Sequence, residues 1–132
     1  MKQHFLWISA LVLLVLGGCK SLQEKGNDQF LSGQYQYAIN TFTQILEQDS
    51  SNLEANQVIA ESYRLSNRIE KSEPYYSQLA EKEPSFDTYF FLGQSLKAQQ
   101  KNDEAIAAFE KAKGYNSDEA LLARNQREIE AI

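Results

Sequence analysis

Residues 93–109, GQSLKAQQKNDEAIAAF, hold a small residue at Gly93, another at Ala105 and an aromatic ring at Phe109. The same three kinds of residue recur upstream at one spacing. Counting back 33 residues, and then 34 more, gives two further sets: Ala60, Ser72 and Tyr76, and then Gly26, Ala38 and Phe42. A period of this length indicates one structural unit written three times, whose copies stack to share a core.

The spacing of apolar residues within each unit is helical. In the second unit Ile59 and Tyr63 share one face, and Ile69, Tyr76 and Leu79 share another. Turn residues separate these faces, and Pro84 ends the unit because the residue before a proline disfavours helix. The stretch 49–52 offers side chains that can cap the next helix. We therefore predict an all-α fold with helices near 21–32, 35–48, 53–66, 69–82, 85–99 and 102–114.

This pattern resembles the tetratricopeptide repeat (TPR), whose 34-residue unit is a helix–turn–helix. The stretches 33–39 (GQYQYAI) and 102–109 (NDEAIAAF) are especially typical of it. The resemblance implies a right-handed superhelix of about three such units plus a C-terminal capping helix. The implied domain is 19–132, with repeats at about 19–52, 53–85 and 86–118 and a cap helix at about 119–132.

The predicted cap helix reads EALLARNQREIEAI over residues 119–132. Four apolar residues in it can form one stripe against the third unit: Leu121, Leu122, Ile129 and Ile132. Four charged residues are then available to water on the other side: Arg124, Arg127, Glu128 and Glu130. Such an end helix, polar on its outer side, is what a stacked array needs at its terminus.

The first 18 residues read as an export signal. Lys2 precedes a 12-residue apolar run, Phe5–Leu16, which is shorter than the roughly 20 residues that span a bilayer. The following Leu16-Gly17-Gly18-Cys19 resembles the lipobox of bacterial lipoproteins, which implies lipid attachment at Cys19 and a signal peptide at 1–18. Acyl chains contribute about 0.8 kcal/mol per buried methylene, and two or more hold a protein firmly. An ordinary secretory signal and an uncleaved anchor helix are the alternatives.

Composition excludes most kinds of catalytic and metal-binding site from the chain that follows Cys19. Cys19 is the only cysteine and His4 the only histidine, so the remaining chain cannot form a disulfide, a Cys/His zinc site or a Ser-His pair. The formal charge of −5, with no basic cluster, argues against nucleic acid, where neutralising phosphates supplies most of the affinity. We therefore predict no enzyme activity, no cofactor and no metal.

The resemblance also implies a concave side, lined by the first helix of each pair, that holds extended ligands. The residues we expect to contact a partner there are Asn27, Glu61, Arg64, Phe90, Phe91, Gln94 and Lys97. Either Phe90 or Phe91 could instead pack against the neighbouring helix, and Arg64 and Lys97 could simply be solvated. Some relatives clamp a terminal carboxylate with Lys and Arg in this groove. Of those positions only Asn27 matches, and the rest are Gln23, Val58, Asp87 and Phe91, so such a clamp is not expected.

Residues 60–68 and 89–97 are similar to the repeat region of envelope lipoproteins that continue into a β-propeller and an OmpA-like domain, some of which serve type IX secretion. The resemblance implies a lipid-anchored scaffold that binds protein partners in a bacterial envelope complex concerned with secretion or outer-membrane assembly. It would be held by lipid on Cys19 at the outer membrane, facing the periplasm. The alternative is a receptor for glycan, a peptidoglycan fragment or another small ligand in the same groove.

Overall fold

The chain folds into a stack of antiparallel helices. The structure is a computed structural model that describes residues 20–132. In chain order its elements are α2 (Leu22–Leu31), α3 (Tyr35–Gln48), α4 (Leu53–Leu65), the 3₁₀ turn η1 (Ile69–Ser72), α5 (Glu73–Lys82), α6 (Phe86–Ala98), α7 (Asn102–Lys113) and α8 (Glu119–Glu130). All described elements are helical, which confirms the predicted fold class, and the predicted helix limits lie within about two residues of these except at the start of α5.

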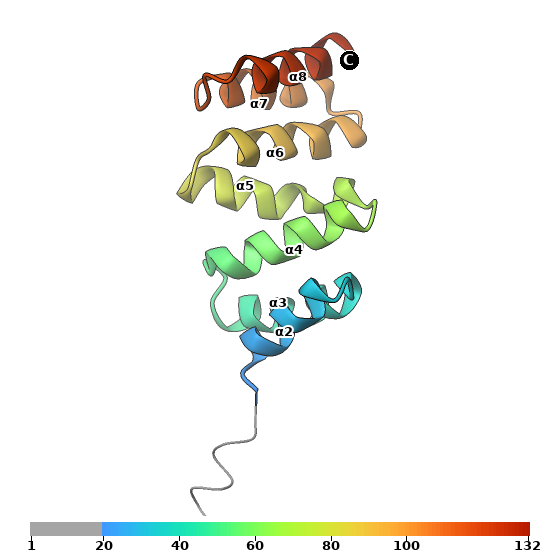
Figure 1. Ribbon diagram of the computed structural model, residues 1–132, viewed down its shortest axis with the longest axis vertical. Coiled ribbons are helices and arrows are strands. Elements are labelled where there is room, and N and C mark those ends of the chain that lie inside the picture. The colour runs from blue at the N-terminus through green and yellow to red at the C-terminus, as the bar shows by residue number, and fades with distance from the viewer. Residues whose placement is uncertain (1–19) are drawn as a thin grey trace, which may run out of the picture.

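The helices follow one another along the long axis of the molecule, from the α2–α3 hairpin at one end to α8 at the other (Figure 1). Contacts run almost entirely between helices that are neighbours or next neighbours in the chain. Each hairpin therefore buries its apolar side against the next, and no long loop has to bring distant segments together.

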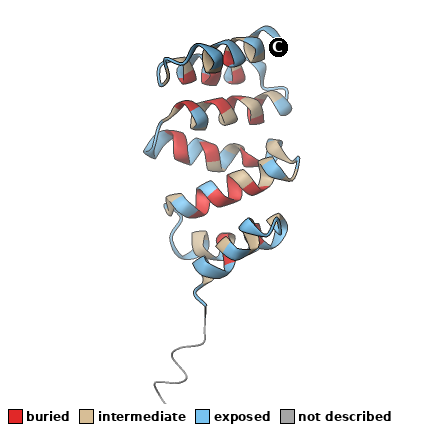
Figure 2. Cartoon of the chain, viewed as in Figure 1, coloured by how far each residue is buried: buried red, intermediate tan, exposed pale blue. Residues whose placement is uncertain are grey.

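The residues of the repeating columns form the core. Ala38, Ser72 and Ala105, the small residues of the second helices, are all fully buried. Their aromatic companions Phe42 and Phe109 are fully buried as well. Buried positions are concentrated in the hairpins from α4 to α7, while α2 at the end of the stack is mostly exposed (Figure 2).

Two glycines explain the close approach of paired helices. A Cβ added to Gly26 would lie 2.6 Å from the nearest ring atom of Phe42, and one added to Gly93 would lie 2.6 Å from the nearest ring atom of Phe109. Because real carbon contacts are about 3.5–4.0 Å, only glycine lets the ring sit against the helix backbone. The two glycines thus account for the close packing of α2 on α3 and of α6 on α7.

Every even-numbered helix begins at a side-chain cap. The caps accept a hydrogen bond from a backbone N–H in the first turn, at Ser21, Asn52, Ser85 and Asp118. Such caps contribute about 1 kcal/mol each. The predicted cap candidates in the stretch 49–52 thus resolve to Asn52, which accepts from the Ala55 N–H at 2.9 Å.

The turns inside the hairpins share one backbone conformation. Gly33, Asn67 and Gln100 occupy the same place in their units and have φ of +74°, +58° and +61°. This left-handed region is easy for glycine and tolerable for asparagine. The sequence repeat therefore extends to backbone geometry even where the residue type changes.

The segment 69–72 differs from the expectation of one helix over 69–82. It forms the 3₁₀ turn η1, and the α-helix starts only at Glu73. Pro74 explains the difference, because its ring nitrogen has no hydrogen to bond the Glu70 carbonyl and its ring would crowd that carbonyl in a continuous α-helix.

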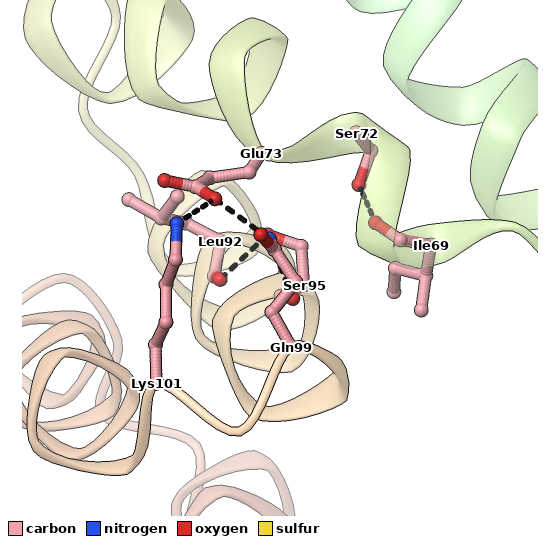
Figure 3. Close-up of polar contacts among 7 residues, drawn as sticks. All are labelled: Ile69, Ser72, Glu73, Leu92, Ser95, Gln99 and Lys101. Carbon is pink, nitrogen blue, oxygen red and sulfur yellow. Dashed lines mark hydrogen bonds and ion pairs between the residues drawn. The ribbon is translucent and has the colours of Figure 1, made fainter.

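Glu73 ties the second hairpin to the third. Its carboxylate accepts hydrogen bonds from Gln99 Nε2 at 2.6 Å and from Lys101 Nζ at 2.8 Å, so the start of α5 is fastened to the α6–α7 turn (Figure 3). The hydrogen bond and charge of Lys101 hold the pKa of Glu73 below its usual value. Ser72 and Ser95 beside this junction are fully buried and donate to carbonyls three residues earlier, those of Ile69 and Leu92.

Candidate functional site

The face built by the first helix of each unit is the candidate binding surface. We call it the even-helix face, because α2, α4, α6 and α8 contribute to it. Two of its three helix junctions are bridged by carboxylates. Glu54 of α4 accepts hydrogen bonds from Gln23 and from Asn27 Nδ2, the latter at 3.1 Å. Glu128 of α8 performs the same function at the other end.

Glu128 accepts from Gln94 Nε2 at 3.2 Å and pairs with Lys97 Nζ at 3.0 Å. The expectation that Glu128 is simply available to water is therefore wrong, since its side chain is only 27% exposed. Three predicted partner contacts lie on this face: Asn27, Gln94 and Lys97. Their polar groups form hydrogen bonds or ion pairs with neighbouring helices of the same chain.

The middle junction is built differently. Glu61 and Arg64 of α4 pair with each other, with Arg64 Nε 3.1 Å from a Glu61 oxygen. Tyr76 of α5 donates to the other Glu61 oxygen at 2.6 Å. Burial, followed by this hydrogen bond, raises the pKa of Tyr76 far above its ordinary value, and the hydrogen bond to Glu61 raises the pKa of Arg64. The network is thus a fixed phenol–carboxylate–guanidinium cluster.

Phe91 of α6 completes this junction. The Arg64 guanidinium carbon lies 4.6 Å from the Phe91 ring centroid, and the Tyr76 ring centroid lies 5.6 Å away. Within residues 20–132 no ion pair links α4 directly to α6, in contrast to the carboxylate bridges at the other two junctions. On this face the Arg64–Phe91 cation–π contact joins α4 to α6, and the packing of Tyr76 on Phe91 joins α5 to α6.

A cavity of about 400 Å³ opens at the middle junction. Its walls come from α4, α5, the turn before α6 and the first turns of α6. The lining residues are Gln57, Glu61, Tyr76, Leu79, Glu83, Pro84, Ser85, Asp87, Thr88 and Phe91. The cavity therefore joins an apolar floor to a rim rich in carboxylates, a combination that suits ligand sites of this size.

The three consecutive aromatic residues of α6 take three different directions. Phe90 is 1% exposed and packs on Phe86 and Phe109, so the prediction that it contacts a partner is wrong. Tyr89 stacks on Tyr115 at 5.4 Å, in the α7–α8 connection. Only Phe91 lies in the wall of the cavity.

Several residues of this site were not among the predicted contacts. Gln57 precedes Glu61 by one helical turn, so periodicity could have found it. The side chains of Tyr76 and Leu79 come from a second helix of a pair and were expected only in the core. Asp87 stood among the groove positions implied by the repeat but not among the expected partner contacts. Nothing in the local sequence separates Glu83 from ordinary surface carboxylates.

The remaining site predictions concern the N-terminus. Cys19 and the segment 1–18 lie outside the described residues. Among residues 20–132, no helix combines the length and the apolar character needed to cross a membrane. The same part of the chain contains no group of three potential metal-ligating side chains.

Comparison with known proteins places this arrangement among TPR structures. The model for the tetratricopeptide repeat matches residues 86–119. The type III secretion chaperone SycD of Yersinia enterocolitica, solved with a peptide of the translocator YopD, is 17% identical with a TM-score of 0.68, over 83% of this chain and 88% of that one. No curated protein sequence matches.

Two further structures are similar at slightly higher identity. The first TPR of Spaghetti (RPAP3), bound to the HSP90 peptide SRMEEVD, is 24% identical with a TM-score of 0.68, over 83% of this chain and 88% of that one. The Sgt2 TPR domain of Aspergillus fumigatus is 25% identical with a TM-score of 0.62, over 83% and 77%. The chain therefore carries a tetratricopeptide repeat and has the helical fold of TPR proteins.

Proposed function

We propose that this chain is a non-catalytic scaffold that holds an extended segment of another protein on its even-helix face, while a lipid on Cys19 tethers it to the bacterial envelope. The observation that carries the binding role is the cavity at the α4–α6 junction. There, apolar surface at Leu79 and Phe91 lies beside polar groups that can orient a ligand.

The structural relatives support an extended polypeptide as the ligand. SycD and the first TPR of RPAP3 were both solved with bound peptides. A peptide bound here would cross the even-helix face, with one side chain entering the cavity and its backbone available to the amide groups at the rim. Gln57 is exposed and placed for such a contact.

The chemistry of the site favours binding over catalysis. The body of the chain has no histidine and no cysteine beyond Cys19. Among the carboxylates that line the cavity, Glu61 accepts hydrogen bonds from both Arg64 and Tyr76. A general base needs a free lone pair within reach of substrate, and this carboxylate is already committed to structural bonds.

The envelope location rests on the N-terminal pattern. An apolar run followed by Leu16-Gly17-Gly18-Cys19 supports export and lipidation. On the resemblance of residues 60–68 and 89–97 to the repeats of OmpA-like envelope lipoproteins, we extend the proposal to a scaffold in a secretion or assembly complex, facing the periplasm from the outer membrane.

A receptor for glycan or another small ligand is the second candidate, and the cavity size supports it. About 400 Å³ lies in the usual range of small-molecule sites, roughly 300–1,000 Å³. The aromatic ring is less suitable for sugar stacking, because Phe91 is already contacted by Arg64 and Tyr76. Stabilisation against heat by purified wall fragments, but not by peptides, would favour this candidate.

Site-specific photocrosslinking in cells tests the scaffold directly. A photoreactive amino acid replaces Gln57 at the cavity, and the matched control carries it at Gln78, an exposed glutamine of α5 outside the cavity lining. We expect a protein adduct from position 57 only, with the crosslinked peptide mapping to one segment of the partner by mass spectrometry. Absence of an adduct from position 57, or equal adducts from both positions, would refute the assignment of this face.

A further inference from the structure

The cavity at the α4–α6 junction carries negative charge that the protein does not neutralise. Glu83 and Asp87 both line it, and no cation among residues 20–132 forms an ion pair with either of them. Arg64, the cation of this junction, forms its ion pair with Glu61. The net charge of the cavity is therefore negative even when the Glu61–Arg64 ion pair is included.

The floor of the same cavity is apolar and aromatic. Tyr76 and Leu79 are each only 3% exposed, and Pro84 and Phe91 complete the surface. A lysine or arginine side chain matches this arrangement, because its methylene stem packs on apolar groups while its charged end stays at a polar rim. The ring of Phe91 already receives the Arg64 guanidinium at 4.6 Å, so an incoming cation would pair with the rim carboxylates rather than with this ring.

We propose that the side chain entering this cavity is a lysine or arginine within an extended, basic segment of the partner. The inference rests on the proposed peptide-binding function and specifies its ligand. The stem of the basic residue packs on Leu79 and Phe91, and its cation pairs with Asp87 and Glu83. An acidic segment meets like charge at the same rim and is rejected.

Asp87 also has a purely local role, which the test must separate from binding. It is the second residue of α6, where a carboxylate interacts favourably with the helix dipole. Asp103 offers a matched control, because it is the second residue of α7 and lies outside the cavity lining. Asp87→Asn and Asp103→Asn remove the same charge from the same helical position, and only the first alters the cavity.

The experiment uses the full chain, purified in detergent, and four pools of degenerate ten-residue peptides. The pools differ only at one fixed central position, which is lysine, arginine, glutamine or glutamate. We expect the lysine and arginine pools to be retained about tenfold better than the glutamate pool. Raising the salt from about 0.1 M to about 1 M shortens the screening length from about 10 Å to about 3 Å, so retention of the basic pools should fall.

The variants then locate the effect. We expect Asp87→Asn to weaken binding of the basic pools about fivefold, and Asp103→Asn to leave it within about twofold of the wild type. Equal retention of the glutamine, glutamate and basic pools, or equal behaviour of the two variants, overturns the inference while leaving peptide binding intact. Retention of none of the four pools overturns the peptide-binding function and the inference together.

Discussion

Replacing Gly93 with alanine tests whether the repeating contact between a small residue and an aromatic ring holds the array together. The new Cβ would lie 2.6, 2.7 and 2.9 Å from three ring atoms of Phe109. The Phe109 ring cannot move away freely, because it is fully buried and the centroid of the Phe90 ring lies 5.7 Å from its own. Relief therefore requires α6 and α7 to separate or Phe109 to leave its preferred rotamer.

The expected magnitude combines two opposing effects. Overpacking a tight core costs about 1–3 kcal/mol, and a displacement of nearly 1 Å against a fully buried ring belongs to the upper part of that range. Alanine returns about 1 kcal/mol through its higher helix propensity. The net loss is about 1–2 kcal/mol, which for a unit of this size lowers the melting temperature by about 4–8 °C.

Thermal unfolding followed by circular dichroism measures this loss, with Gly114→Ala as the control. At Gly114 the nearest atom to an added Cβ is a backbone oxygen at 3.4 Å, and φ is −71°, so alanine should change the melting temperature by less than about 2 °C. Phe109→Leu should restore part of the stability lost in Gly93→Ala when the two are combined, as a double-mutant cycle detects. Melting of Gly93→Ala at or above the wild-type temperature would show that the close contact is not a constraint.

Two further predictions concern polar groups, and a third concerns the lipid anchor. Lys101 lowers the pKa of Glu73 in the folded protein. The ionised Glu73 carboxylate therefore stabilises the fold above the unfolded pKa of about 4.5, and this stabilisation is lost as the pH falls through the lower folded pKa. Glu73→Gln should reduce the melting temperature at pH 7 and make the melting temperature less dependent on pH in the acid range. Tyr76→Phe removes the 2.6 Å hydrogen bond to Glu61 and should cost about 1 kcal/mol, measured by urea unfolding, with no change expected if that bond is dispensable. Cys19→Ser should move the protein from the membrane to the soluble fraction on cell fractionation, and retention at the membrane would contradict lipid anchoring.

The fold could be predicted from the sequence because one physical requirement recurs at each unit. A small residue must face an aromatic ring where paired helices touch, and the requirement leaves columns at Gly26 and Gly93 that are visible without a structure. The helix ends were equally accessible, since they depend on local caps such as Asn52 and Ser85. The overlooked 3₁₀ turn also had a local signal, the proline at position 74.

The site was less predictable because it depends on which helix lies opposite each side chain. Successive residues of a helix turn by 100°, so the sequence could show that Phe90 and Phe91 differ in direction but not which one faces the core. Glu128 was expected in water for the same reason, whereas Arg124 is exposed as expected. In the structure Glu128 bridges to Lys97, and the Arg124 guanidinium carbon lies 4.5 Å from the Phe90 ring centroid.

The cavity includes residues that the sequence could assign and residues that it could not. Its floor includes Tyr76 and Leu79, which helical periodicity assigns correctly to the interior. Its rim includes Asp87, which the resemblance to the repeat places in the groove, and Glu83, which resembles many other surface carboxylates until α4 and α6 are placed side by side. A site between two repeats therefore becomes visible only when the stacking geometry is known.

The unequal fastening of the even-helix face has a mechanical consequence. Carboxylate bridges at Glu54 and Glu128 stiffen the two outer joints, whereas the middle joint is held by a guanidinium resting on a ring. A ring face resists sliding less than a directional hydrogen bond does, so on this face α4 and α6 should move apart more easily than the helices at the outer joints. The Glu73 contacts to the α6–α7 turn then act as the hinge of that movement. A force transmitted between a tethered end and a bound partner would therefore deform the joint that contains the cavity first. The same few side chains would then determine both ligand binding and bending.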